Sequence, residues 1–178
     1  LSMSDKKYRD LLYAEKDHVA TITLNRPERY NAIREGMYEE IIDALMRAGW
    51  NRDIGVIVLT GAGEKAFCTG GDQGDKGKGR YGTGTLGVPV EILHNTIRDV
   101  PKPVIARVQG TATAAGCQLV ATCDLAIAAD TASFATPGVD IGLFCSTPMV
   151  AISRNIPRKR VMEMLLTGTP ITAQEAVE

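Results

Sequence analysis

The hydrophobic and polar positions of the N-terminal half follow first a strand period and then a helix period. Apolar residues at every second position of residues 19–24 predict a strand, which a turn at 16–18 joins to a second strand at 11–15. Between residues 34 and 50, apolar side chains recur every three or four positions and predict a helix with one buried face. Residues 56–60 form a continuous run that is rich in β-branched residues, which is typical of a strand buried on both sides.

The second half continues this alternation of strands and helices. Pattern and turn residues predict a short extension at 66–68, a helix at 90–99 with Ile92, Leu93 and Ile97 inward, a strand at 104–108, a helix at 115–122, a strand at 125–128, and helices at 149–155 and 158–166. The order strand, strand, helix recurs, so we expect an α/β domain of stacked β-β-α units.

A length of 178 residues suits one domain. We expect residues 1–10 to be a flexible N-terminus that begins with a cloning remnant, and residues 11–170 to form the core. Residues 171–178 read as the start of an incomplete C-terminal helical region. Thr172 and Glu175 there have the spacing of a capping box, and the chain stops three residues later.

Composition and charge exclude several classes of protein. Twenty basic and 21 acidic residues give a net charge of −1. This balance argues against a dedicated nucleic-acid or anionic-membrane partner, which would require a basic excess. No apolar run approaches the roughly 20 residues that span a bilayer. The N-terminus lacks the apolar core of a signal peptide, so we expect a cytoplasmic protein with reduced thiols. Four cysteines without C-x-x-C spacing and two histidines predict neither a metal site nor a redox cofactor.

One glycine motif is weak. Residues 82–87 match the dinucleotide-binding pattern G-x-G-x-x-G, but a buried strand must precede that motif. Residues 77–81 are too polar and glycine-rich to form one. We therefore interpret the segment as a loop.

Two other glycine-containing segments are more informative. Residues 66–72 follow a buried strand and contain Gly70 and Gly71, whose amides can approach a ligand closely. Residues 110–118 form a small-residue turn at a helix N-terminus, where free N–H groups favour negative charge. Two such donors aimed at one point make an oxyanion hole. From the residues alone, two tight turns in a packed core are an equally good interpretation.

These segments resemble the crotonase (enoyl-CoA hydratase/isomerase) superfamily. Leu24 to Pro27 with Asn31 and Ala32 resembles its N-terminal signature, and residues 67–72 and 110–126 resemble its two oxyanion segments. The resemblance implies a spiral of β-β-α turns, assembly into trimers or hexamers, and stabilisation of a thioester enolate by two backbone N–H groups. By motif position these belong to Gly71 and Ala115.

The ligand implied is an acyl-CoA thioester, in which coenzyme A is part of the substrate and not a separate cofactor. The candidate coenzyme A contacts are Ala32, Thr69, Lys76 and Lys78. For the two lysines, a solvated charged loop is the alternative.

The resemblance differs along the chain. Up to about Gly110 it is greatest to 2-ketocyclohexanecarboxyl-CoA hydrolase, a ring-opening enzyme, and to naphthoyl-CoA synthase, through residues 67–73 and 93–103. From about Thr111 it is greater to a hydratase-domain-containing mitochondrial paralogue group, through residues 112–118 and 134–138.

This sequence departs from the family pattern at the two residues that act as general acid and general base. Hydratases of this family use two glutamates, and Gln118 and Gly138 stand at those positions. An amide is no useful base near neutral pH and glycine has no side chain, so simple hydration is not expected.

Three further candidates each have a structural alternative. Cys145 is a candidate nucleophile or a buried apolar cysteine. Asp140 is a candidate base or a cap of the next turn, and His94 is a candidate base or a packing residue. Asp72 is expected to hold its loop through side-chain-to-backbone bonds.

The sequence thus predicts a homo-oligomeric crotonase-fold lyase, isomerase or hydrolase acting on an acyl-CoA thioester. The alternatives are a CoA-thioester or ring-opening hydrolase, and a non-catalytic acyl-CoA-binding or oligomerisation protein. The acyl group stays undetermined.

Overall fold

The computed structural model describes residues 7–74 and 88–178. Its strands are β1 (Leu11–Lys16), β2 (Val19–Leu24), β3 (Val56–Gly61), β4 (Ala66–Cys68), β5 (Val104–Val108), β6 (Thr111–Thr113), β7 (Leu125–Ala128), β8 (Ser133–Ala135) and β9 (Ile171–Thr172). Its α-helices are α1 (Met37–Trp50), α2 (Val88–Asp99), α3 (Ala115–Thr122), α4 (Ser146–Ile152), α5 (Arg158–Thr167) and α6 (Ala173–Val177), with 3-10 turns at Pro27–Arg29 and Pro137–Ile141.

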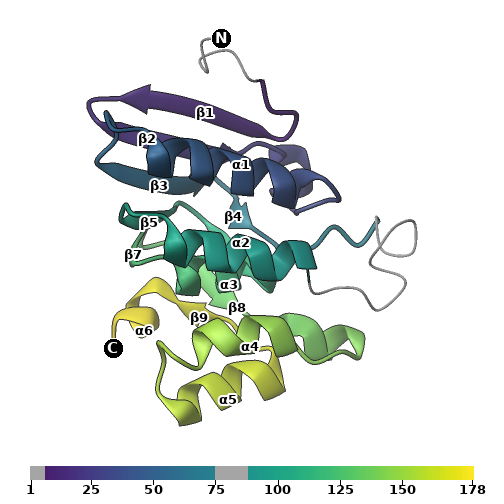
Figure 1. The fold of residues 1–178 in the computed structure, drawn as a ribbon. Helices are drawn as coiled ribbons and strands as arrows, with labels where there is room; N and C mark the ends of the chain where they lie inside the picture. Colours follow the sequence, from purple (N-terminus) through teal and green to yellow (C-terminus); the bar gives the residue numbers. More distant parts are fainter. Residues whose placement is uncertain (1–6, 75–87) are drawn as a thin grey trace.

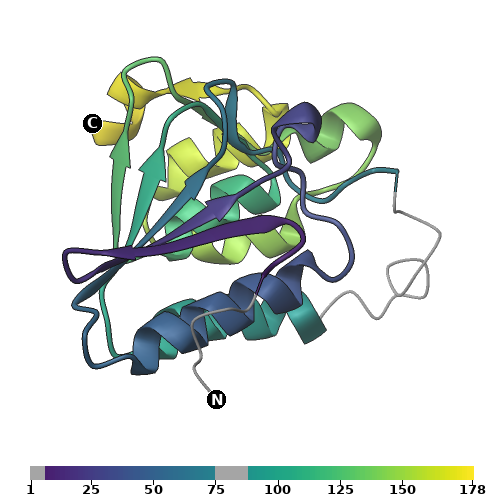
Figure 2. The ribbon, with the colours of Figure 1, turned by 90° about the horizontal axis from the view of Figure 1, so that it is seen from above.

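The strands divide between two sheets. Within the described residues, one sheet has the order β1-β2-β3-β5-β7 and the other has the order β4-β6-β8-β9. Strands β2, β3, β5 and β7 are parallel, and β1 pairs antiparallel with β2. The first repeat places both of its strands, β1 and β2, in the first sheet before α1, and the repeats that begin with β3, β5 and β7 place one strand in each sheet before their helix. The expected spiral of β-β-α units is therefore confirmed, and Figures 1 and 2 show its stacked turns from the side and from above.

The core lies between the first sheet and the stacked helices. Alternate residues of β2 point into it, because successive side chains of a strand face opposite sides; Ala20, Ile22 and Leu24 are fully buried. Met37, Ile41 and their helical neighbours supply the facing stripe of α1. Helices α1 and α2 pack side by side, as do α3 and α4 (Figure 1).

The structure corrects several expected details. Helix α1 starts at Met37 instead of residue 34, because the Met37 N–H closes a turn onto the Arg34 carbonyl at 3.1 Å. Ile92 was expected inward but is 46% exposed, since it lies on the outer side of the helix while Leu93 and Ile97 take the inner one. Helix α4 spans Ser146–Ile152 instead of 149–155. The Asn155 side chain donates to the Ala151 carbonyl at 2.9 Å beyond its end.

The short strands β6, β8 and β9 were not predicted, because two or three residues are too few to show a period. The capping box of α6 is confirmed. Thr172 Oγ1 accepts from the Glu175 N–H, and the Glu175 carboxylate accepts from the Thr172 N–H.

Helix α3 lies unusually close to β4. A Cβ atom built on Gly116 would stand 2.0 Å from the carbonyl oxygen of Cys68, so only glycine fits at this position. This approach joins the end of β4, which belongs to one spiral turn, to the start of the helix in the next.

Replacing Gly116 by alanine is expected to lower the free energy of unfolding by about 3 kcal/mol, because the backbone of Cys68 cannot yield without moving β4. Urea denaturation measures this. Gly55→Ala is the matched control, since the nearest atom to its new Cβ is 3.8 Å away. Equal stabilities of the two variants contradict the prediction.

Candidate functional site

Two cavities adjoin α3. Cavity A, of about 490 Å³, lies where the two glycine-containing turns meet the segment after β8. Its lining comprises Ile33, Tyr38, Thr69, Gly71, Asp72, Gln73, Val90, Ala114, Ala115, Gln118, Pro137, Gly138, Ile141 and residues 143–148. Cavity B, of about 710 Å³, lies among α2, α3 and α4 and is lined by His94, Arg98, Thr122, Arg154 and their neighbours.

The first turn follows β4 and is shaped by Gly70. This residue has φ of +97°, which favours glycine. A Cβ atom there would also come within 2.9 Å of the Ala114 Cβ, so the two turns pack against each other.

Hydrogen bonds on both sides hold Gly71 in place. The Ile33 N–H donates to the Gly70 carbonyl, and the Asp72 N–H donates to the Ile33 carbonyl, each at 2.8 Å. No acceptor among the described residues takes the N–H of Gly71, and no atom lies within 4 Å of the place where its Cβ would stand.

The second turn places Ala115 at the start of α3. Ala114 has a strained backbone, with φ of 50° and ψ of −118°, and its N–H donates to the Ala135 carbonyl at 3.0 Å. The Thr113 hydroxyl donates to the Thr69 carbonyl at 3.1 Å and ties the two turns together. As first residue of the helix, Ala115 has an N–H that no described acceptor takes. Both expected donors, Gly71 and Ala115, thus line cavity A.

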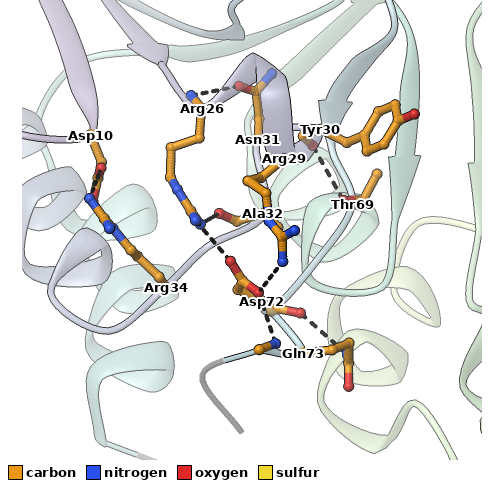
Figure 3. A network of polar contacts seen from close by, with 12 residues as sticks. Asp10, Arg26, Arg29, Tyr30, Asn31, Ala32, Arg34, Thr69, Asp72 and Gln73 are labelled. Atoms are coloured by element: carbon orange, nitrogen blue, oxygen red, sulfur yellow. Dashed lines mark hydrogen bonds and ion pairs between the residues drawn. The ribbon is translucent and has the colours of Figure 1, made fainter.

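A buried ion pair anchors the first turn. The Asp72 carboxylate accepts from Arg26 at 2.8 Å, from Arg29 at 3.3 Å and from the Gly74 N–H at 2.9 Å (Figure 3). The Arg26 hydrogen bond, with smaller contributions from Gly74 and Arg29, holds the pKa of Asp72 below its ordinary value although burial opposes this. Asp72 therefore holds its loop as expected, and the ion pair with Arg26 adds to that role.

Arg26 is itself fixed by a buried asparagine. The Asn31 side chain accepts from the Arg26 N–H at 3.0 Å (Figure 3). It also donates to the Ala62 and Ala66 carbonyls. The Arg26 guanidinium also donates to the Ala32 carbonyl at 2.5 Å. Ala32, a candidate coenzyme A contact, is thus buried beside this network and does not line cavity A.

Thr69, another candidate coenzyme A contact, lines cavity A. Its hydroxyl donates to the Tyr30 carbonyl at 3.3 Å (Figure 3). Lys76 and Lys78 lie outside the described residues, as does the glycine motif at 82–87.

Gln118 and Gly138 both line cavity A, at the positions where the resemblance places the glutamates of hydratases. A Cβ atom on Gly138 would stand 2.7 Å from the Leu143 carbonyl oxygen and 2.8 Å from the Cys145 sulfur. Leu143 and Cys145 therefore occupy the space into which a side chain at position 138 would grow.

His94 is not in cavity A but in cavity B. Its Nδ1 lies 2.9 Å from the Thr122 hydroxyl, whose single hydrogen is donated to the Gln118 carbonyl at 2.7 Å. The hydroxyl must therefore accept from Nδ1–H, which leaves Nε2 unprotonated. Burial, with a smaller effect of Arg98, lowers the pKa of His94 to about 4. The ring is neutral at pH 7 and lines cavity B, whereas Gly71 and Ala115 line cavity A.

The other two candidate residues, Cys145 and Asp140, differ in their position relative to cavity A. Cys145 is buried in the wall of cavity A, directly before α4. Burial raises the pKa of Cys68, Cys117 and Cys123 to about 12, so these thiols are protonated and inert at neutral pH. Asp140 is exposed in the 3-10 turn and is not part of the cavity lining.

Sequence reasoning missed the apolar wall of cavity A. Ile141, Leu143 and Phe144 line it, although they lie in a segment that has neither strand nor helix periodicity. It also missed the arginine partners of Asp72. The signal that could have found them is the charge pattern of the Arg26-Pro27-Glu28-Arg29 turn.

Two general properties of the described residues bear on the chemistry. Residues 7–74 and 88–178 contain no group of three or more histidine, cysteine, aspartate or glutamate side chains that could hold a metal ion. No helix within these two stretches is sufficiently long and apolar to cross a membrane.

A spiral of β-β-α turns with two unpaired N–H groups at adjacent turns is the architecture of a crotonase-fold protein. The family model for enoyl-CoA hydratase/isomerase matches residues 14–178, and the chain belongs to this family. The crystal structure of a Mycobacterium smegmatis enoyl-CoA hydratase superimposes with a TM-score of 0.89 at 43% identity, over 95% of this chain and 66% of that one.

The chain is similar to enoyl-CoA hydratase domain-containing protein 3. The human protein's crystal structure superimposes with a TM-score of 0.88 at 41% identity, over 95% of this chain and 67% of that one. The curated rat protein is 44% identical over 92% of this chain, and the zebrafish protein 40% identical over all of it. The chain spans 55% and 62% of the lengths of these two relatives.

These comparisons settle part of the expected resemblance. The likeness of the C-terminal part to the mitochondrial paralogue group is confirmed, and it extends through the N-terminal part as well. The resemblance of the N-terminal part to ring-opening hydrolases stays a prediction. The cytoplasmic expectation was wrong: it rested on a missing signal peptide, and these curated relatives are named as mitochondrial proteins.

Replacing Asp72 by asparagine is expected to lower the free energy of unfolding by about 3 kcal/mol at pH 7, because Arg26 loses its buried counter-charge. The folded pKa of Asp72 is depressed, so its stabilisation is complete above the unfolded value near 4 and is lost as the pH falls below it. Thermal unfolding from pH 7 to pH 2.5 measures this, and the difference in stability between the two proteins should narrow toward the acid end. A gap that stays constant with pH contradicts the ion pair.

Proposed function

We propose that this protein binds an acyl-CoA thioester in cavity A and stabilises its enolate through the N–H groups of Gly71 and Ala115. The observation that carries the proposal is that these two unpaired donors, from different turns of the spiral, line one cavity. The family membership supports it, because a thioester of coenzyme A is the ligand named in the description of the family.

The electrostatics of α3 favour charge at this point. Ala115 begins a helix of eight residues, so its N–H carries the positive end of the helix dipole. Strained Ala114 and the bonds around Gly71 fix both donors before any ligand arrives, and preorganised donors stabilise a developing oxyanion most effectively.

The proposed reaction is not simple hydration. Among the described residues that line cavity A, the one carboxylate is Asp72, which Arg26 and Arg29 already hold. Gln118 and Gly138 supply no proton acceptor. The chemistry proposed is therefore that of a crotonase-family lyase, isomerase or hydrolase, and Cys145 is the nucleophile candidate for a thioester or ring-opening hydrolase.

A non-catalytic acyl-CoA-binding protein is the second candidate, and the same shortage of free carboxylates favours it. Exchange of the C2 hydrogens of butyryl-CoA in deuterium oxide separates the two, because an enolate must form before deuterium enters. A homo-oligomer stays part of the proposal: β7 is an edge strand whose Leu125 and Ile127 are 59% and 66% exposed.

Butyryl-CoA should bind more tightly than free coenzyme A, and Gly71→Pro should reduce its affinity about tenfold by removing one N–H donor. Gly71→Ala keeps the N–H and adds a methyl group into open space, so it should bind like the wild type. Calorimetry measures both affinities.

The proline costs the fold no hydrogen bond, since the Gly71 N–H has no described acceptor. Circular dichroism and thermal melting confirm that both variants fold. The proposed oxyanion hole is contradicted if Gly71→Pro and Gly71→Ala bind butyryl-CoA with equal affinity. It is also contradicted if butyryl-CoA binds no more tightly than coenzyme A.

Restoring glutamates should not create a hydratase. In the double variant Gln118→Glu, Gly138→Glu, the second side chain collides with the Leu143 backbone and Cys145, so its carboxylate cannot take a position in cavity A. We expect no hydration of crotonyl-CoA by the loss of its enoyl absorbance, and a lower melting temperature than that of Gln118→Glu alone. Measurable hydration by a double variant that melts like Gln118→Glu alone refutes this view of Gly138.

A further inference from the structure

Gln118 is one of three described residues that line both cavities, together with Val90 and Thr147. It lines cavity A with Ala115 and cavity B with His94, and its side chain is buried, with 6% of its surface exposed. The backbone of the same residue is fixed by α3, where its carbonyl accepts from Thr122.

The amide of Gln118 presents its nitrogen and not its oxygen. Among the described residues, Gln118 Oε1 is the one shielded side-chain polar atom without a hydrogen-bond partner. The amide nitrogen has no protein partner there either, and it is not among the shielded atoms, so it is the end that reaches open space. The amide N–H is thus free to donate to an acceptor on a ligand.

Gln118 lies on the same face of α3 as the proposed oxyanion donor, Ala115. Gln118 is three residues after Ala115, a spacing that places two residues on one helix face about 4.5 Å apart along the axis. Side chains on a helix lean toward its N-terminus, which brings the amide back toward Ala115. A thioester oxygen at Ala115 therefore leaves the Gln118 N–H beside the next carbons of the acyl chain.

We propose that Gln118 is a specificity-determining residue whose amide N–H donates to a carbonyl oxygen on the third carbon of the acyl group, so that cavity A selects 3-oxoacyl thioesters. The inference rests on the proposed function and adds the substrate class to it. The amide of Gln118 offers an N–H donor to a carbonyl oxygen at this position. A glutamate carboxylate in its place would repel that oxygen.

The chemistry of such a substrate suits a site without a free base. The C2 hydrogen of a 3-oxoacyl thioester is acidic because two carbonyl groups share the enolate charge, so its proton can pass to water or buffer. The charge then lies on two oxygens, one facing Gly71 and Ala115 and the other facing Gln118. All three are N–H donors, and the one described carboxylate in the cavity lining is already paired with Arg26.

The test compares acetoacetyl-CoA with butyryl-CoA in calorimetric titrations of the wild type, Gln118→Met and Gln118→Glu. We expect the wild type to prefer acetoacetyl-CoA, Gln118→Met to lose about fivefold of that preference, and Gln118→Glu to lose more because its carboxylate repels the 3-oxo group. Comparing the ratio of affinities across variants cancels any part of the preference that comes from the enolate bound at Gly71 and Ala115.

Gln174→Met is the matched control. Gln174 is exposed in α6 and lines neither cavity. Its replacement should leave the ratio unchanged. Circular dichroism checks that every variant folds.

The outcomes separate the two proposals. If butyryl-CoA binds no better than coenzyme A, the proposed function fails and this inference fails with it. If butyryl-CoA binds well but the acetoacetyl preference is the same in wild type and Gln118→Met, the role of Gln118 alone is overturned. A wild-type preference for 3-hydroxybutyryl-CoA over acetoacetyl-CoA also overturns it, since Gln118 would then act as an acceptor through Oε1.

Discussion

The close approach of two backbone segments is the constraint on which the candidate site depends. Gly116 brings the start of α3 against the Cys68 carbonyl, and Gly70 brings the first turn against Ala114. These contacts join consecutive turns of the spiral at the point where each leaves an N–H without an acceptor. The two donors belong to residues 44 positions apart in the chain, so neither segment makes the site alone. A larger side chain at either glycine separates the turns, and the paired donors are lost with the packing.

The reactions that cavity A can support are limited by the donors in its described lining and by the shortage of a free base there. Its described lining offers N–H and hydroxyl groups, and its one described carboxylate, Asp72, is engaged by Arg26 and Arg29. A ligand rich in acceptors suits such a surface, whereas activation of a water molecule requires a base that these residues do not supply. At position 138 the carboxylate is missing, and Leu143 and Cys145 also fill the space that its side chain would need. These features support the proposed binding and polarisation of a thioester over the addition of water to one.

Much of this could be predicted from local pattern. Residues close together in the sequence determine the alternation in β2, the apolar stripe of α1 and the capping box of Thr172 and Glu175. The structure confirms all three features. The family motifs also placed Gly71 and Ala115, and the structure brings the two into one cavity. Long-range packing was not predictable. The wall formed by Leu143 and Phe144 comes from a segment without periodicity, and nothing near His94 in the sequence shows that it lines cavity B whereas Gly71 lines cavity A.

The infrared spectrum of butyryl-CoA labelled with carbon-13 at the thioester carbonyl tests the central claim most directly. Two N–H donors on one oxygen polarise the carbonyl bond and weaken it. The account predicts that the labelled carbonyl band moves to lower wavenumber when the protein binds the thioester, compared with the same compound in water. A band that stays in place or moves to higher wavenumber on saturation would mean that the carbonyl lies outside the reach of Gly71 and Ala115, and it would contradict the account.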